Sequence, residues 1–367
     1  MMQRAIELAR LGRYTNHPNP RVGCVLVQGE RIVGEGWHRK WGEPHAEVHA
    51  LAAAGEAARG ATVYVTLEPH SYQGRTPPCT EALIRAGVAR VICGTLDPNP
   101  RVHGEGVRQL EAAGIEVRTG LLEEQVRALN LGFEKRMTRG LPRVIVKMAA
   151  SIDGRVALAG GESRWITGPA ARADVHRLRA EASAVLTGIG TVLADDPQLT
   201  VRDPQIELLG RQPLRVVLDS QLRMPGAARM LREPGETLVF TRPEAPARSA
   251  ALTQAGAQVL TVPPDDAGAL DLESVLRALA ERQCNDVLVE AGPTLAGRFV
   301  EQGWADELIV YQAPMLLGPQ ARPMLHLSEP ARLAHAPRFT LRASEALGPD
   351  LKLVYVPRPR GGPDPAE

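Results

Sequence analysis

The sequence predicts two successive α/β domains, residues 1–141 and 142–357, followed by a short tail at 358–367. The length of 367 residues corresponds to two domains of roughly 100–200 residues each. In both halves, short β-branched runs alternate with helix-forming segments. The basic segment KRMTRGLPR joins the halves and is too short to be a long flexible linker. The tail has almost no apolar side chains to bury, so we expect it to be disordered.

The first domain is expected to begin with an amphipathic helix, because Ile6, Leu8 and Ala9 line one of its sides. A β-hairpin follows at 22–37, with its turn around Gly29. The later elements are a helix at 45–58, a strand at 61–69, a helix at 80–86, a strand at 90–94, a helix at 107–113 and a strand at 115–118. Strands alternating with helices predict a three-layer α/β/α domain with a largely parallel sheet.

The second domain shows the same alternation and no internal repeat. Its first strand is expected in RVIVKMAASIDGR. Later strands are expected in AVLTG, LRVVLD, TLVFT, QVLTV, DVLVE and ELIVYQAP. Helices are expected at 170–180 and 272–282. The pattern predicts a second α/β domain.

Composition narrows the class of protein. The net charge of +1 provides no global field to hold a polyanion, so nucleic acid is not a favoured partner. No apolar run approaches the roughly 18 residues needed to cross a bilayer, and the N-terminus lacks the apolar core of a signal peptide. Four scattered cysteines do not form a disulfide framework. We therefore expect a cytoplasmic protein without membrane partners.

Four residues of the first domain predict a zinc site. His45 and Glu47 open the expected helix, His70 follows Glu-Pro, and Cys79 follows Pro-Pro. A His-x-Glu followed by a Pro-Cys motif is typical of zinc-dependent nucleobase deaminases. A catalytic zinc needs three protein ligands and one open position for water, here His45, His70 and Cys79. Glu47 would move the proton between water and the leaving ammonia.

Other polar residues of the first domain are less specific. Cys24 and Cys93 fall in expected buried strands, where cysteine is typically a small core residue. His17, His38 and His49 are interpreted as structural or exposed. Asn19, in a Pro-Asn-Pro turn, is either a substrate contact or a plain turn residue, since an amide can both donate to and accept from a pyrimidine.

The second domain lacks a G-x-G-x-x-G turn but contains a weaker ligand signal. In EAGPTLAG, a strand is followed by Gly292, Pro293 and Thr294 and then by an expected helix. Glycine lets a backbone approach a ligand closely, and a helix N-terminus offers free N–H groups to phosphate. An ordinary strand-to-helix turn explains the pattern equally well. Lys147 lies inside an apolar strand, where a lysine is rarely buried without a partner, so we expect an active-site role.

Longer motifs resemble a known family across nearly the whole chain. They are HPNPRVGCVLV, PHAEVHAL, YVTLEP, GRTPPCTEALI, GTLDPNP, KMAASIDGR, GESRWITG, LRAEASAVLTGIGTVLADDPQLTVR, VLDS and VEAGPTLAG. Together they resemble the bifunctional deaminase/reductases of riboflavin biosynthesis. The resemblance implies a cytidine-deaminase-like first domain and a second domain similar to dihydrofolate reductase. The family has a cysteine where this chain has His70, a departure that puts metal affinity in doubt, although a His-His-Cys site is chemically reasonable.

The resemblance also implies two reactions and their site residues. A diaminopyrimidinone carrying ribosylamino 5′-phosphate would be deaminated with one Zn²⁺, and NADPH would then reduce its ribosyl chain. NADPH would contact Ala149, Trp165, Thr191, Asp195, Ser220, Gly292, Pro293, Thr294, Leu295, Ala296 and Gly297. The phosphorylated substrate would contact Ser163, Arg179, Leu199, Arg202 and Glu290. The candidates Asn19 and Lys147, argued above from the residues themselves, are added to these as substrate contacts. Arginine forks such as those of Arg179 and Arg202 suit a phosphate.

Two alternatives stay open. The first domain could deaminate a free nucleoside or RNA, although neutral charge and few aromatics disfavour RNA. It could instead be a degenerate or structural module, with only the reductase active, because His70 departs from the family. Preference for NADPH over NADH comes only from the resemblance, and a homo-oligomer is compatible with the sequence.

Overall fold

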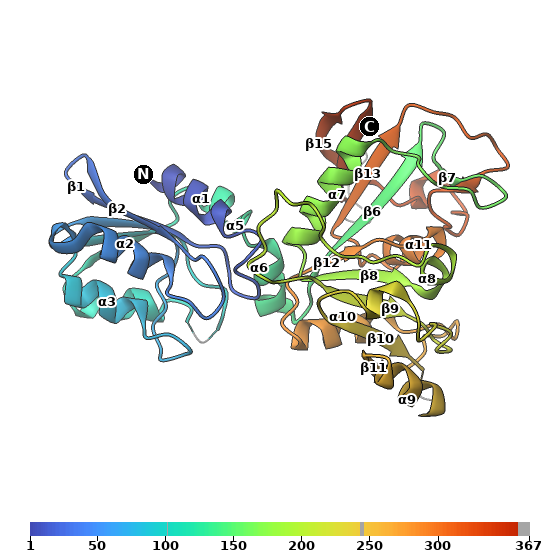
Figure 1. Cartoon of the computed structure of the whole chain (residues 1–367). Helices are drawn as coiled ribbons and strands as arrows, with labels where there is room; N and C mark the ends of the chain where they lie inside the picture. The colour runs from blue at the N-terminus through green and yellow to red at the C-terminus, as the bar shows by residue number, and fades with distance from the viewer. Residues whose placement is uncertain (101, 243–245, 359–367) are drawn as a thin grey trace. The chain divides into compact units, whose positions relative to one another are not determined.

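The computed structural model describes residues 1–100, 102–242 and 246–358 (Figure 1). Contacts divide the chain into two compact units. One comprises Met1–Leu141 with Glu207–Gly210, and the other comprises Pro142–Ile206 and the chain from Arg211 onward. Among the described residues, none of the helices combines the length and apolarity that crossing a bilayer requires. Of the tail expected to be disordered, residues 359–367 lie outside the described residues.

The first unit contains five strands and the helices that cover them. In chain order its elements are α1 (Met2–Leu11), β1 (Gly23–Gln28), β2 (Arg31–Trp37), α2 (Ala46–Ala54), a 3-10 turn (Gly55–Ala58), β3 (Thr62–Leu67), α3 (Cys79–Ala86), β4 (Arg90–Thr95), α4 (Glu105–Ala112), β5 (Glu116–Thr119), α5 (Glu123–Arg127) and α6 (Leu131–Arg139). Helices α5 and α6 were not expected from the sequence. Figure 1 shows α1 and α5 on one face of the sheet and α2 and α3 on the other.

Strand β1 shows why the unit has three layers. Its side chains alternate between the two faces of the sheet, as the period of a strand requires. Cys24 and Leu26 pack in the core formed with α2, α3 and α4, whereas Val25 and Val27 pack against α1. All four are buried, so both faces of the sheet are covered at β1. The predicted α/β/α layering is confirmed.

The expectation of a largely parallel first sheet is wrong. The strand order is β2-β1-β3-β4-β5, and β1 pairs antiparallel with both β2 and β3. Only β3–β4 and β4–β5 are parallel. The tight turn at Gly29, with φ of +59°, forces the chain to reverse between β1 and β2. Parallel pairs need a crossover helix, and α3 and α4 provide one for each of the last two pairs.

The second unit is built on a nine-stranded sheet. Its elements are β6 (Arg143–Ser151), β7 (Arg155–Ala157), α7 (Pro169–Glu181), β8 (Ala184–Gly188), α8 (Ile189–Asp195), β9 (Leu214–Leu218), a 3-10 turn (Arg229–Leu231), β10 (Thr237–Thr241), α9 (Pro246–Gln254), β11 (Ala257–Thr261), α10 (Leu272–Glu281), β12 (Asp286–Val289), α11 (Pro293–Glu301), β13 (Glu307–Ala313), β14 (Arg322–Pro323), a 3-10 turn (Leu333–His335), β15 (Phe339–Leu347) and β16 (Asp350–Pro357). The sheet order is β11-β10-β9-β8-β12-β6-β13-β16-β15.

Most of this sheet is parallel, which brings the carboxyl ends of its strands to one edge. The pairs from β11 to β13 are parallel, while β16 and β15 add an antiparallel hairpin at the end. That hairpin was not expected from the sequence. On one face, α7 contributes Ala171 and Val175 to a core with Ile309, Tyr311 and Val354. The carboxyl edge of such a sheet is where open α/β folds bind ligands.

Candidate functional site

Two helix N-termini place the predicted zinc-site residues of the first unit. His45 is the N-cap of α2 and has an extended backbone, so Glu47 lies in the first turn of that helix. Pro78 is the N-cap of α3, and Cys79 is its first residue. Because both helices pack on the same face of the sheet, their starts meet there. The expected helix at 45–58 in fact begins at Ala46 and ends in a 3-10 turn.

His45, Glu47 and Cys79 form a compact cluster. One potential ligand atom from each lies within 4.8 Å of the others. His45 Nδ1 is 3.2 Å from Cys79 Sγ, and Thr76 Oγ1 lies 3.3 Å from His45 Nε2. Cys79 is fully buried and Glu47 is 3% exposed. Histidine, cysteine and carboxylate are the side chains that bind zinc in proteins, so the donor set suits that ion.

The electrostatics of the cluster disfavour charge on its own residues. Burial raises the pKa of Glu47 to about 6 and that of the Cys79 thiol well above its ordinary value. Burial also lowers the pKa of His45 to about 4, which leaves a neutral imidazole with a free lone pair. A bound cation would reverse this balance, because a metal ion stabilises a thiolate and a carboxylate.

His70 lies beside this cluster rather than inside it. Its ring centre is 5.4 Å from that of His45 and 4.2 Å from that of Tyr72. Its Nδ1 is buried and has no hydrogen-bond partner among the described residues, and the same holds for Glu47 Oε2. Unpaired buried polar atoms are costly. One such atom on His70, beside the cluster, suits a metal ligand, and one on Glu47, inside it, suits a group that carries a proton.

Two further residues lie next to this cluster. His38, interpreted from the sequence as structural or exposed, is 2% exposed, and its ring centre is 5.2 Å from that of His45. Asn19 Nδ2 donates to His38 Nε2 at 3.1 Å, so Asn19 is connected to the cluster through His38. Thr76, which contacts His45, was not singled out from the sequence. His38 and Thr76 lie in irregular segments where no spacing rule points to them, although Thr76 stands three residues before Cys79.

In the second unit, Lys147 and Glu290 meet at the carboxyl edge of the sheet. Lys147 is in β6 and Glu290 directly follows β12, the neighbouring strand. Burial lowers the pKa of Lys147, while the negative charge of Glu290 opposes that shift. Lys147 Nζ also lies 5.7 Å from the centre of the Tyr311 ring. The active-site role expected for Lys147 stays a prediction.

The guanidinium group of Arg179 forms hydrogen bonds with other groups of the protein. Its Nε and Nη2 donate to the two carboxylate oxygens of Glu290 at 2.6 and 3.0 Å, and its Nη1 donates to the main-chain oxygen of Thr200 at 3.1 Å. Arg202 is more exposed and donates to Thr200 Oγ1 at 3.0 Å. Leu199 has a left-handed backbone with φ of +54° and a side chain buried in the core, so only its main chain can face a ligand.

The residues expected to contact NADPH lie on loops and helix starts along the same sheet. Gly292 is the N-cap of α11, where it and Thr294 are exposed. Ala296 and Gly297 are buried, and a Cβ at Gly297 would collide with the main-chain oxygen of His326. Pro293 and Leu295 are half-buried. The exposed N–H groups at this helix start could hold a phosphate.

The other expected contacts are spread over neighbouring segments. Arg164 donates to the main-chain oxygen of Asp195 at 3.0 Å, which links the loop carrying Ser163 and Trp165 to the end of α8. Trp165 is 67% exposed, so its indole is open to a ligand. Three further residues are half-buried: Ala149 in β6, Thr191 in α8 and Ser220 after β9.

Family models match both units. A model described as the cytidine and deoxycytidylate deaminase zinc-binding region matches residues 1–95. A model described as the RibD C-terminal domain matches residues 142–353. The first range contains the His/Glu/Cys cluster, and the second contains the nine-stranded sheet except for its last residues.

Full-length relatives show the same pairing of domains. The riboflavin biosynthesis protein RibD of Escherichia coli (strain K12) is 51% identical over 97% of this chain and 98% of that protein. The Haemophilus influenzae protein of the same name is 47% identical over 97% of this chain and 96% of its own length. Among solved structures, Acinetobacter baumannii RibD (form 1) superposes with a TM-score of 0.91 at 46% identity, covering 98% of each chain. A Thermotoga maritima diaminohydroxyphosphoribosylaminopyrimidine deaminase/5-amino-6-(5-phosphoribosylamino)uracil reductase gives 0.83 at 37% identity, covering 97% of each.

Proposed function

The chain belongs to the RibD family of riboflavin biosynthesis proteins, and from this premise we propose which of its residues carry out the two reactions of that family. It is a bifunctional enzyme with a zinc-binding deaminase domain and a reductase domain of the NADPH-dependent type. The alternative of a reductase with a degenerate first module is not favoured, because both domains match their families and the full-length relatives. The domain limits we propose are 1–141 and 142–357.

We propose that His45, His70 and Cys79 hold the zinc ion, with Glu47 as the catalytic proton carrier. The buried, unpartnered Nδ1 of His70 and Oε2 of Glu47 are the observation that carries this assignment. When bound, zinc acts as a Lewis acid and lowers the pKa of water towards about 7. Glu47 accepts the proton of the attacking water and returns it to the nitrogen that leaves as ammonia. Its surroundings exclude bulk water, so the proton stays within the site.

The amide of Asn19 is proposed to orient the pyrimidine. Its nitrogen donates to His38, and the Nδ1 of His38 in turn donates to the main-chain oxygen of Pro44 at 3.3 Å. This chain of hydrogen bonds fixes the amide, so that its oxygen can accept from a donor on the base. The substrate is a small phosphorylated pyrimidine, and we propose 2,5-diamino-6-ribosylamino-4(3H)-pyrimidinone 5′-phosphate, in line with the activity named for the Thermotoga maritima protein.

For the second reaction we propose that the sugar lies over the carboxyl edge of the large sheet. NADPH, when bound, supplies the hydride that converts the ribosyl group to a ribityl chain. Lys147 and Glu290 would face the sugar, and the exposed Arg202 would bind its phosphate. Arg179 is tied to Glu290, so its proposed contribution to substrate binding is to orient that carboxylate.

The remaining assignments follow the family. NADPH is proposed to contact the start of α11, Trp165, and the segments carrying Ala149, Thr191, Asp195 and Ser220. Substrate contact by Ser163 and by the main chain of Leu199 belongs to the same proposal. We further propose a cytoplasmic location, supported by the few, scattered cysteines, which form no disulfide among the described residues. Assembly into a homo-oligomer stays a prediction.

A Glu47→Gln variant tests the deaminase assignment. We expect it to keep its zinc but to release ammonia about 10²–10⁴-fold more slowly, because an amide cannot carry the proton. NADPH oxidation with the deaminated substrate should continue at the parent rate. Glu56→Gln, on the exposed 3-10 turn after the same helix, is the matched control. Ammonia release within tenfold of the parent would rule out Glu47 as proton carrier, and release that persists after complete zinc removal would rule out the metal assignment.

A further inference from the structure

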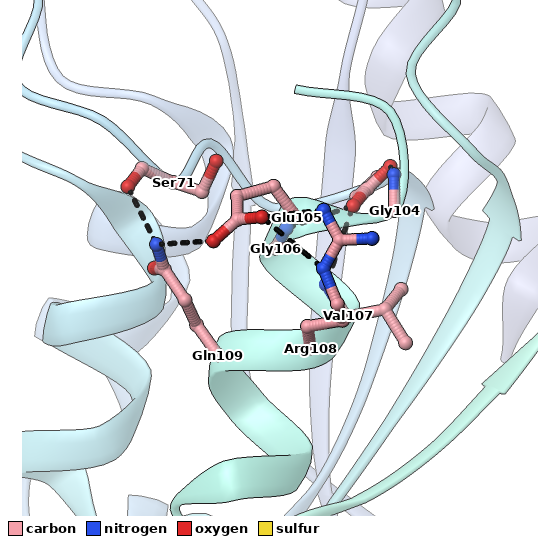
Figure 2. Close-up of polar contacts among 8 residues, drawn as sticks. Ser71, Gly104, Glu105, Gly106, Val107, Arg108 and Gln109 are labelled. Carbon is pink, nitrogen blue, oxygen red and sulfur yellow. Dashed lines mark hydrogen bonds and ion pairs between the residues drawn. The ribbon is translucent and has the colours of Figure 1, made fainter. Parts of the chain in front are cut away.

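Helix α4 contributes none of the residues proposed for catalysis, yet one of its side chains reaches both segments that carry zinc ligands. Thr80 Oγ1 donates to Gln109 Oε1 at 2.7 Å. Gln109 Nε2 donates to the main-chain oxygen of Ser71 at 3.1 Å, and Figure 2 shows this amide lying between Ser71 and Glu105. Thr80 follows Cys79 in the chain, and Ser71 follows His70. A single amide therefore connects the neighbours of two proposed ligands.

The two ligand segments are also joined directly. Thr80 N donates to the main-chain oxygen of His70 at 3.2 Å. With the bonds of Gln109 to Thr80 and Ser71, this bond completes a hydrogen-bonded ring that links the residues following His70 and Cys79. Thr80 is fully buried, so water cannot readily replace a partner that it loses. A ring of this kind fixes the separation of the two ligand side chains before a metal arrives.

The carboxylate of Glu68 fixes α4 itself against the segment that carries His70. Glu68 Oε1 accepts from the backbone N–H groups of Gly106 and Val107 at 2.9 and 3.2 Å, and its Oε2 accepts from Gly104 at 2.9 Å. A Cβ at Gly106 would collide with the main-chain oxygen of Pro69, so the start of the helix lies directly against this segment. The position of Gln109 thus follows from the position of Glu68.

We propose that Gln109 is a positioning residue of the zinc site, which acts through Thr80 and Ser71 to hold Cys79 and His70 at the spacing the ion needs. This inference rests on the proposed function, since it takes His70 and Cys79 as ligands. Partners that orient metal ligands typically change metal affinity by about 10–100-fold when they are removed. If Gln109 only held α3 and α4 together, removing its side chain would lower the stability of the fold without a matching loss of zinc affinity.

The test compares zinc release from purified full-length variants loaded with zinc. Release is followed with a colorimetric chelator, and thermal unfolding of the metal-free chains is recorded alongside. Thr80→Val removes the hydroxyl with little change in shape. Gln109→Met removes the hydrogen bonds of the amide to Thr80 and Ser71, together with the longer one to Glu105 Oε1 at 3.4 Å. Thr80→Ser keeps the hydroxyl as the conservative rescue. Arg108→Gln changes the neighbouring residue, whose side chain is 68% exposed, and is the matched control.

We expect Thr80→Val and Gln109→Met to release zinc about 10-fold faster or more, while Thr80→Ser and Arg108→Gln stay within about twofold of the parent. Parent-like release from both Thr80→Val and Gln109→Met would overturn the inference, as would equal acceleration by Arg108→Gln. If Gln109→Met does not fold, the Thr80→Val and Thr80→Ser pair decides the question. A parent chain that binds no zinc would instead refute the proposed function, so the two failures are distinguishable.

Discussion

Replacing the buried Glu68 by glutamine should weaken the start of α4 much more than its small chemical change suggests. One carboxylate oxygen accepts from Gly106 and Val107, and the other accepts from Gly104 and from Asp97 N at 3.1 Å. An amide nitrogen cannot accept, so two of these four N–H groups would lose their partner. Hydrogen bonds to a charged group contribute about 1.5–3 kcal/mol each, which puts the loss at about 3 kcal/mol or more.

A local loss of about 3 kcal/mol corresponds to roughly 100-fold faster exchange of the amides that Glu68 protects. Hydrogen–deuterium exchange of the full chain, read by mass spectrometry over the start of α4, measures it. Glu105→Gln is the control, because Glu105 is on the same helix but its side chain is 42% exposed and pairs with Arg108. Exchange in Glu68→Gln that matches Glu105→Gln would refute the idea that the carboxylate holds this helix start.

Two further predictions concern the second unit. Gly297→Ala should lower the unfolding temperature of the second unit and the rate of NADPH oxidation. The new methyl group collides with the main chain of His326, at an expected cost of about 1–3 kcal/mol. An unchanged unfolding temperature, or an equal loss of ammonia release, would contradict this. Burial alone would raise the pKa of Glu290, but the charge and hydrogen bonds of Arg179 outweigh it and lower that pKa. The stability that the Arg179–Glu290 pair adds to the folded protein should therefore be complete above about pH 4.3, the pKa of an unfolded glutamate. It should be lost as the pH falls through the lower pKa of Glu290 in the folded protein. The stability difference between the parent and Glu290→Gln should accordingly shrink below about pH 4, and a difference independent of pH would contradict the assignment.

Local sequence pattern was enough to predict most helices and strands and the central residues of the zinc cluster. The hairpin of β1 and β2, and the alternation of strands and helices after it, follow from period and turn residues. His45, Glu47 and Cys79 were predicted from a His-x-Glu followed by a Pro-Cys motif, and the structure brings one potential ligand atom of each within 4.8 Å of the others. His70 was found by its motif, but its place beside the cluster, next to Tyr72, is a matter of packing.

Sequence pattern did not predict the direction in which the strands of the first sheet pair, nor the last two strands of the chain. Alternating strands and helices suggested a parallel first sheet, yet β3 lies antiparallel beside β1. The hairpin of β15 and β16 was not expected from the sequence, and in the structure Phe339–Leu347 is exposed along most of its length. Arg179 was expected to bind a phosphate, and only the structure shows its fork on Glu290, a residue 111 positions away in the chain.

The sequence by itself determined the two α/β domains, the residue types of a zinc deaminase site and the motifs of the family, because these depend on local spacing and on chemistry carried by single side chains. Tertiary structure alone decided which groups partner them: His38 with Asn19, Arg179 with Glu290, and Gln109 with the segment after His70. The reason is physical. Hydrogen bonds and ion pairs between distant segments depend on how helices and strands pack, and packing leaves no period in the chain to be recognised beforehand.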